Sequence, residues 1–199
     1  MTMHLVLHGL AIKKHAAAGD IAGLIGLAPE ITASYLEKAA ASGRAVEANS
    51  KYMLSGLARI ALDCDYSRVY APVRADRAFM DAYEGFERIN IQLKTLITDW
   101  QTMEVGGQRV VNDHSDKAHD AKIIDRLGNL HERADAILAE LTKRVARLDY
   151  YRQHLLAALE RAEDGQIEWV SDARIESYHT LWFELHEDLL RIVGRTRVE

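Results

Sequence analysis

The chain has 199 residues, of which 48% are hydrophobic, and carries a formal net charge of −5. This weak negative charge does not favour general attraction to nucleic acid or to an anionic membrane. The single cysteine, Cys64, excludes an intramolecular disulfide and any multi-cysteine metal site, so we expect it to be a small apolar filler. Many helix-favouring residues and only two prolines predict a mainly α fold.

The first expected helix covers residues 3–17. His4 and His8 stand one helical turn apart, but no third ligand of matching spacing lies nearby, so we expect two surface or capping histidines and no metal site. The basic pair Lys13-Lys14 follows the apolar run, which is the reverse of a signal peptide. No apolar run is long enough to span a bilayer, so we expect a cytoplasmic protein without a membrane partner.

Residues 20–66 predict a winged helix. Asp20 is a suitable N-cap for a short helix over 21–27, and Pro29 opens a second helix that runs to residue 42. Two strand-length pieces then flank the turn Asn49-Ser50, and Ser55 caps a closing helix. Because each local signal agrees with one fold, we place a winged-helix domain at residues 1–68.

In a winged helix the second helix enters the major groove and the wing touches the DNA backbone. A helical wheel points Ile31, Tyr35 and Ala39 inward and leaves Glu30 and Glu37 on the outer face. Carboxylates there make a poor surface for DNA, so DNA binding and protein contact both stay open. The DNA-binding candidates are Lys13, Lys14, Ser34, Lys38, Arg44 and Lys51.

Residues 73–196 predict an antiparallel α-helical domain of about four helices, which we expect to dimerise. Apolar residues recur at spacings of three and four along a long helix at 73–103, which Gly106-Gly107 should end. The segment 104–117 is expected to be a loop with a short extended piece, Arg109-Val110-Val111, and helices are expected at 118–147 and 148–162. Asp172 should cap the last helix, 173–194.

Two stretches of this half carry candidate chemistry. The loop Asn112-Asp113-His114-Ser115-Asp116, with His119 and Asp120, could hold a metal or a polar ligand, or it could simply cap the next helix through Ser115 or Asp116. The last helix places two histidines and a tryptophan in an apolar stripe, as core residues or as the wall of a ligand pocket. The predicted effector pocket is Trp100, Asp113, His114, Tyr178, His179, Trp182 and His186.

Signatures of catalysis are missing. Glu176 and His179 form one E-x-x-H pair, but a di-iron bundle needs a second such pair and none occurs. The chain has no phosphate-binding glycine loop and no G-x-S-x-G elbow. We therefore expect no catalytic residues, no cofactor and no enzymatic activity.

Four stretches, HGLAIKKHA, TDWQ (98–101), NDHSD (112–116) and SYHTLWFELHEDLL (177–190), resemble a group of actinobacterial proteins with an N-terminal winged helix and a C-terminal helical domain. That group occurs alone and also beside, or fused to, the swivelling phosphohistidine domain of phosphoenolpyruvate-utilising enzymes. This chain lacks the histidine-bearing loop of that domain, so the resemblance implies a regulator or an accessory module that carries no phosphoryl group itself.

The sequence as a whole predicts a homodimeric winged-helix transcriptional regulator that binds double-stranded DNA and a small-molecule effector. The alternative is a non-catalytic accessory or interaction module of a phosphoenolpyruvate-utilising enzyme system.

Overall fold

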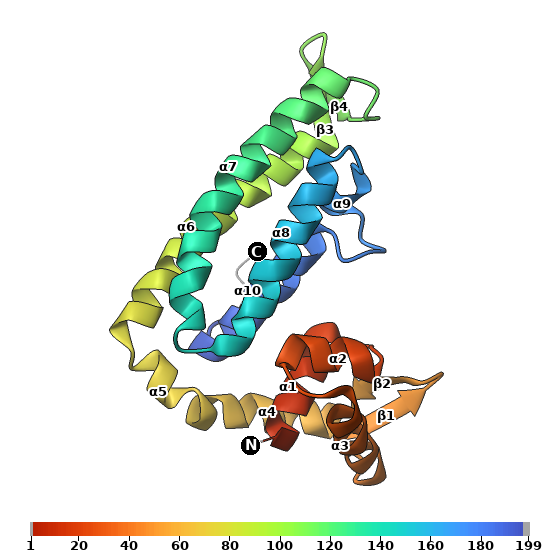
Figure 1. The fold of residues 1–199 in the computed structure, drawn as a ribbon, viewed down its shortest axis with the longest axis vertical. Helices are drawn as coiled ribbons and strands as arrows, with labels where there is room; N and C mark the ends of the chain where they lie inside the picture. Colours follow the sequence, from red (N-terminus) through yellow and green to blue (C-terminus); the bar gives the residue numbers. More distant parts are fainter. Residues whose placement is uncertain (1, 197–199) are drawn as a thin grey trace. The chain divides into compact units, whose positions relative to one another are not determined.

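The computed structural model describes residues 2–196, which are mainly helical with small antiparallel hairpins (Figure 1). The chain forms two compact units. One holds the chain up to Asp76 and the segment from His186 onward, and the other holds Arg77–Leu185. The expected domains, 1–68 and 73–196, differ from these units chiefly because the end of the last helix belongs with the first unit. None of the helices in residues 2–196 combines the length and apolar character needed to cross a bilayer.

Residues 2–76 of the first unit form three helices, a β-hairpin, a closing helix and one further short helix. Within the hairpin Val46 lies opposite Met53, and Asn49 and Ser50 at its tip both have positive φ, as a tight two-residue turn requires. Ala16, which precedes the second helix, makes an isolated antiparallel bridge to Tyr52. The elements are α1 (Thr2–Lys13), α2 (Ala18–Ile25), α3 (Pro29–Ala41), β1 (Ala45–Ala48), β2 (Lys51–Leu54), α4 (Gly56–Val69) and the short α5 (Ala71–Arg74).

Two local predictions for this unit are wrong. Asp20 is not an N-cap: α2 begins earlier, and the Asp20 carboxylate accepts the backbone N–H of Ala17 at 3.2 Å from inside the first turn. The inward face of α3 is Thr32, Leu36 and Ala39, whereas Ile31 is 48% exposed. A wheel of apolar residues misses Thr32 because its hydroxyl donates to the carbonyl of Ala28 at 3.1 Å and can therefore be buried.

His8 and Cys64 also differ from expectation. Cys64 is exposed, because α4 buries the stripe Ala58, Leu62 and Tyr66 instead. His8 is fully buried rather than on the surface. Its Nδ1 lies 2.9 Å from the Tyr66 hydroxyl and its Nε2 lies 3.1 Å from Oδ1 of Asp188, which is also fully buried. A buried ionisable group needs such partners, so this contact ties the end of the last helix to α1 and α4.

The second unit is built on a long antiparallel helix pair, α6 and α7, whose connection is a β-hairpin (Figure 1). The expected helix at 73–103 is wrong at both ends, since α6 starts at Arg77 and the chain turns into β3 after Gln101. Gly106 and Gly107 have positive φ and form the hairpin turn. The elements are α6 (Arg77–Gln101), β3 (Thr102–Val105), β4 (Gln108–Val111), α7 (Lys117–Thr142), a 3-10 turn (Ala146–Leu148), α8 (Asp149–Glu163), α9 (Glu168–Ser171) and α10 (Tyr178–Val193).

The start of α10 corrects another prediction. The expected helix from 173 begins only at Tyr178, where the Ser177 hydroxyl accepts the N–H of Thr180 at 3.3 Å. Asp172 binds Arg174 instead of capping the helix. Further along α10, the Trp182 ring stacks on Phe86 of α6 with ring centres 4.8 Å apart. These contacts make the first part of α10 a component of the core of the second unit.

Replacing Asp188 by Ala should destabilise the first unit by about 3–5 kcal/mol, because it leaves His8 buried without its carboxylate. Amide hydrogen exchange of peptides from α1 and α4 measures this loss directly in that unit. The control is Asp81→Ala, which removes a 73% exposed partner of Arg77 and should cost at most about 1 kcal/mol. Equal protection of α1 in the two variants would show that the buried pair does not hold the unit together.

Candidate functional site

The predicted DNA-binding residues lie on the surface of the first unit but form no cationic face on α3. Lys14, Lys38, Arg44 and Lys51 are exposed, and Lys13 and Ser34 are half-buried. The ammonium of Lys38 lies 5.0 Å from the centre of the Tyr35 ring on its own helix. The carboxylates Glu30 and Glu37 are exposed on the same helix. The expected mixture of charges on the outer face of α3 is therefore present, and Ile31 is added to it.

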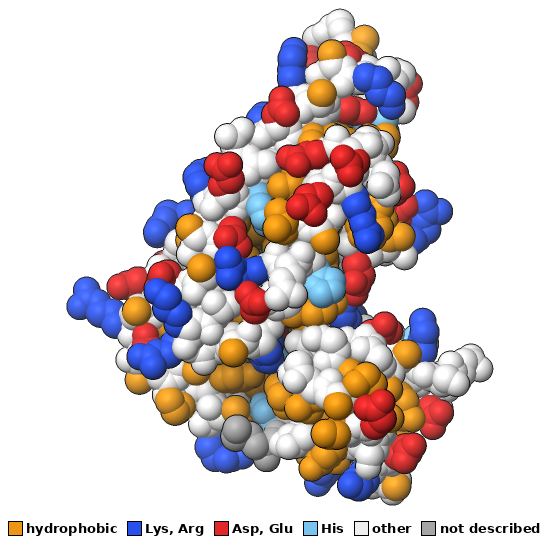
Figure 2. Space-filling view, in the orientation of Figure 1, with side chains coloured by type: hydrophobic (Ala, Val, Ile, Leu, Met, Phe, Trp, Pro, Cys, Tyr) orange, Lys and Arg blue, Asp and Glu red, His pale blue; other side chains and the backbone are white. Residues whose placement is uncertain are grey.

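Large apolar side chains are exposed on the same unit. The cross-strand pair Val46 and Met53 is 51% and 41% exposed on one face of the hairpin, while Tyr52 and Leu54 turn to the core. On α4, Leu57 and Ile60 are 82% and 64% exposed and lie one turn apart. Figure 2 shows hydrophobic side chains on the surface in the region of α3. The second unit also exposes large apolar side chains, but Val46 and Met53 lie directly opposite each other on the hairpin, and adjacent exposed apolar side chains are typical of protein-contact surfaces.

The predicted effector-pocket residues fall into separate groups rather than one pocket. Trp100 packs on His114 with ring centres 4.5 Å apart. Trp182 instead stacks on Tyr178 and donates from Nε1 to Oδ1 of Asn90 at 3.0 Å. Asn90 and Trp100 are ten residues apart on α6, or about 15 Å at 1.5 Å per residue, so the two groups lie at different levels of the bundle.

The other predicted pocket residues do not join these groups. His179 is half-buried, and its burial lowers its pKa. Asp113 is exposed, and hydrogen bonds from the side chain and from the backbone N–H of Ser115, the latter at 3.0 Å, lower the pKa of its carboxyl. His186 belongs to the first unit, whereas the remaining members belong to the second. The structure therefore does not bring these seven side chains together in a single pocket.

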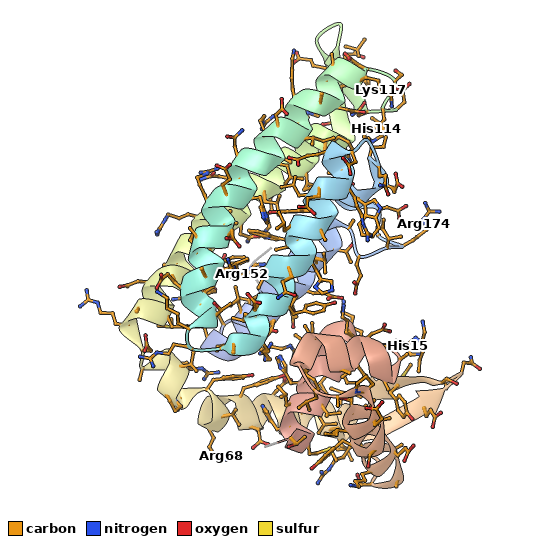
Figure 3. All side chains as sticks on the ribbon, viewed as in Figure 1. His15, Arg68, His114, Lys117, Arg152 and Arg174 are labelled. Atoms are coloured by element: carbon orange, nitrogen blue, oxygen red, sulfur yellow. The ribbon has the colours of Figure 1, made fainter. Side chains whose placement is uncertain are left out.

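The loop before α7 caps that helix, which is the second of the two interpretations given for it from the sequence. Asp116 accepts the N–H groups of Ala118 and His119, each at 3.0 Å. Asn112 donates to Oδ1 of Asp120 at 3.0 Å, and His114 Nδ1 lies 3.1 Å from the same oxygen. Figure 3 shows His114 and Lys117 at the β-hairpin end of α6 and α7. Among the described residues no group of three or more His, Cys, Asp or Glu side chains is placed to hold a metal ion.

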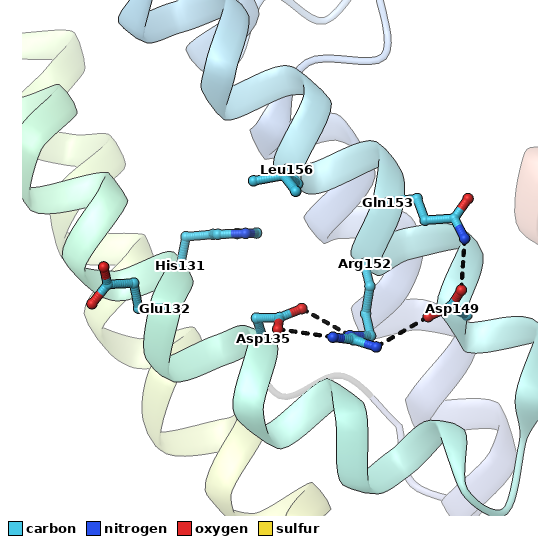
Figure 4. Close-up of a pocket in the computed structure, with 7 residues that line it drawn as sticks. All are labelled: His131, Glu132, Asp135, Asp149, Arg152, Gln153 and Leu156. Carbon is cyan, nitrogen blue, oxygen red and sulfur yellow. Dashed lines mark hydrogen bonds and ion pairs between the residues drawn. The ribbon is translucent and has the colours of Figure 1, made fainter.

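An open recess of about 620 Å³ lies between α7 and α8 in the second unit (Figure 4). The sequence analysis did not identify it, because its residues come from two helices and share no local motif. Its lining residues are His131, Glu132, Asp135, Asp149, Arg152, Gln153 and Leu156.

Arg152 is fixed at one side of this recess by two carboxylates. Its Nε and Nη2 donate to the two oxygens of Asp135 at 2.8 and 2.9 Å, and its Nη1 donates to Asp149 at 3.2 Å. The paired guanidinium lowers the pKa of the Asp135 carboxyl, and the carboxylates raise the pKa of Arg152. These bonds use three of the five guanidinium N–H groups, so two remain for a ligand.

His131 forms the opposite side and is backed by Tyr178. Its Nδ1 lies 3.2 Å from the hydroxyl of Tyr178, which is fully buried. The buried hydroxyl proton needs an acceptor, so we assign Tyr178 as donor to Nδ1 and place the ring proton of His131 on Nε2. Burial lowers the pKa of His131 and raises that of Tyr178. The recess thus offers N–H donors beside carboxylates, an arrangement that can bind a small polar molecule.

The lowered pKa of His131 sets the sign of a pH effect. Its ordinary value is 6.5, so near and below that pH the unfolded chain binds more protons than the folded chain, and stability falls as the pH falls. In His131→Gln the loss of stability between about pH 7.5 and about pH 5.5 should be smaller than in the parent. Urea unfolding at the two pH values measures this, and an unchanged loss would contradict the assignment of a neutral, buried His131.

Comparison with known proteins does not identify these sites. No family model, no characterised protein and no solved structure matches the chain. Its function has to be argued from the surfaces and recesses of its own two units.

Proposed function

We propose that this chain is a non-enzymatic interaction module whose first unit is a winged helix that contacts another protein. The observation that carries the proposal is the exposed pair Val46 and Met53 on the hairpin, the element that would be the wing. The neighbouring helices also expose large apolar residues, namely Ile31 on α3 and Leu57 and Ile60 on α4.

The order of elements supports the winged-helix assignment. Three helices precede a hairpin and a closing helix, and the α2–α3 connection is tight because Pro29 starts α3 directly after the turn. The bridge between Ala16 and Tyr52 adds a third extended position to the hairpin. The wing and the second helix of the pair are the elements that such a domain presents to a partner.

The chemistry of these elements favours a protein over DNA. Phosphate attraction supplies most of the non-specific affinity for DNA, yet α3 exposes Glu30 and Glu37 beside the single cation Lys38. Desolvated apolar side chains are what protein interfaces use at their centres. The resemblance of the chain to proteins found beside phosphoenolpyruvate-utilising enzymes makes an enzyme of that class the partner to test first.

The second unit would supply the regulatory part of this module. Its recess between His131 and Arg152 is the place we propose for a small polar effector, in place of the pocket expected from the sequence. The helical unit also remains the proposed site of homodimerisation.

Replacing both Val46 and Met53 by Lys should weaken binding to the protein partner by at least about tenfold. Two side chains buried at an interface are worth a few kcal/mol, and each tenfold in affinity is about 1.4 kcal/mol. Biolayer interferometry against a purified phosphoenolpyruvate-utilising enzyme of the same organism measures the change. The matched control is Val111→Lys, a substitution at an 81% exposed valine on the hairpin of the other unit, which should leave the affinity unchanged.

The same double variant separates protein contact from DNA contact by the sign of its effect. Added lysines on the hairpin would strengthen binding to a duplex, because they add phosphate contacts, while they would disrupt an apolar protein interface. Tighter DNA binding, together with unchanged binding to the enzyme, would overturn the proposed function.

A DNA-binding transcriptional regulator is the second candidate. It is favoured by the exposed cations Lys14, Arg44 and Lys51, which come from the α1–α2 connection and the two sides of the hairpin. A homodimer would double these contacts, so a modest charge on each subunit could suffice. Under this candidate, the hairpin cations and not α3 would carry the affinity.

If DNA is the partner, Arg44→Ala and Lys51→Ala should each weaken binding to a duplex from the gene's own promoter. Each should also lower the slope of log affinity against log salt by about 0.9, the value for one lost phosphate contact. Fluorescence anisotropy over a range of salt concentrations measures both quantities. Promoter DNA that binds no better than random DNA, with slopes unaffected by either change, would remove this candidate.

A further inference from the structure

The carboxyl of Asp120 is buried but satisfied on one side only. Asp120 lies in the first turn of α7 and is 2% exposed. Its Oδ1 is bound by the Asn112 amide and by the His114 ring. Its Oδ2 is buried and has no hydrogen-bond partner among the described residues. An unpaired carboxylate oxygen inside a protein carries a large desolvation cost, so this oxygen calls for an explanation.

The neighbouring side chains hold this carboxyl in place. Asn112 is itself buried, donates to the carbonyl of Trp100 at 3.0 Å and accepts the N–H of His114 at 3.0 Å. His114 has a φ of 60°, an uncommon conformation for a residue other than glycine, and its ring packs on Trp100. The contacts on Oδ1 are therefore fixed by the loop. Oδ2 is the carboxylate oxygen that these contacts leave without a partner.

Asp120 also lines a recess of about 480 Å³ within the second unit. Its wall combines apolar side chains with charged groups of α7 and α8. The residues that line it are Lys117, Asp120, Ala121, Ile124, Asp125, Ala162, Glu163, Gly165 and Ile167. Three of these carry carboxylates and one carries an ammonium, so the recess has a formal charge of −2.

We propose that this recess binds a small organic cation that carries N–H donors on an apolar stem, with Oδ2 of Asp120 accepting one of its hydrogen bonds. The acidic lining selects a cation, and the buried acceptor selects a group that donates a hydrogen bond. Ile124 and Ile167 provide apolar contact for the stem. A primary ammonium or a guanidinium meets both requirements.

A bound metal ion fits these side chains less well. Hard cations such as Ca²⁺ and Mg²⁺ need several oxygen ligands around one point. Within the described part of the chain, no group of three or more acidic or histidine side chains meets this requirement. The proposal does not depend on the interface of the first unit, so either can fail without the other.

The test is an NMR titration of the full-length protein with n-butylammonium. Amide signals of the first turn of α7 and of the end of α8 should shift and saturate. Tetramethylammonium, which has the charge but no N–H donor, and n-butanol, which has a similar stem but no charge, should bind at least about tenfold more weakly.

Asp120→Asn is the decisive variant, because it keeps the shape of the side chain and an oxygen for Asn112 and His114 but removes the charge. It should lower the affinity for n-butylammonium at least about tenfold. Asp113→Asn, at an exposed position of the same loop, is the matched control and should bind like the parent. Glu163→Gln reports on the opposite wall of the recess and should weaken binding less than Asp120→Asn.

Circular dichroism and the dispersion of the NMR spectrum verify that each variant is folded. Should Asp120→Asn not fold, selectivity for butylammonium over tetramethylammonium in the parent, with the shifts of α7 and α8, still decides the proposal. Absence of saturable binding by the parent, equal affinity for the two cations, or full affinity in folded Asp120→Asn would each overturn it.

Discussion

The first unit depends on a buried contact with the end of the chain. His8 of α1 and Asp188 of α10 are both fully buried and lie 3.1 Å apart, with the Tyr66 hydroxyl on the other ring nitrogen. Arg74 strengthens the attachment by donating to the carbonyls of Ile192 and Arg191 at the end of α10. Because α10 begins in the second unit and ends in the first, the N-terminal fold is completed only by residues more than a hundred positions further on. A fragment that stops at the expected boundary near residue 68 would leave His8 without this carboxylate.

Sequence patterns predicted the elements well where the determining signal is local. Ser55 and Asp116 cap the helices that follow them, and the apolar repeat along α6 marks its buried face. They failed where the deciding partner is distant or polar. The sequence around His8 gives no sign that Asp188 is its partner. The apolar pattern around Ile31 likewise does not show that Thr32 can be buried through its hydrogen bond to Ala28. Strand β3 was missed, and β4 was expected only as a short extended piece, because both strands are short and largely exposed and lack the alternation that identifies half-buried strands.

The candidate sites, too, could be predicted only where their residues lie close together in the sequence. The loop before α7 stood out as a cluster of polar residues, and the structure does bring Asn112, His114 and Asp120 together there. The recess at His131 could not be found in this way, since Asp135 and Arg152 are on different helices and meet only when α7 and α8 pack. The aromatic stripe of α10 was open to two interpretations. Trp182 stacks in the core and satisfies its N–H on Asn90, which is how a buried tryptophan behaves when no ligand is needed.

The closing helix α4 adds a further argument for the proposal that the first unit contacts another protein. Its buried stripe is Ala58, Leu62 and Tyr66, yet Leu57 and Ile60 stand exposed on another face. A surface helix normally has one apolar stripe and one polar face, and a helix that is apolar on more than one side is normally covered on more than one side. The hairpin repeats this pattern, because Leu54 is buried while its neighbour Met53 is exposed beside Val46. Two consecutive elements with apolar residues on both faces are difficult to explain by contact with a polyanion, which would select cations at those positions.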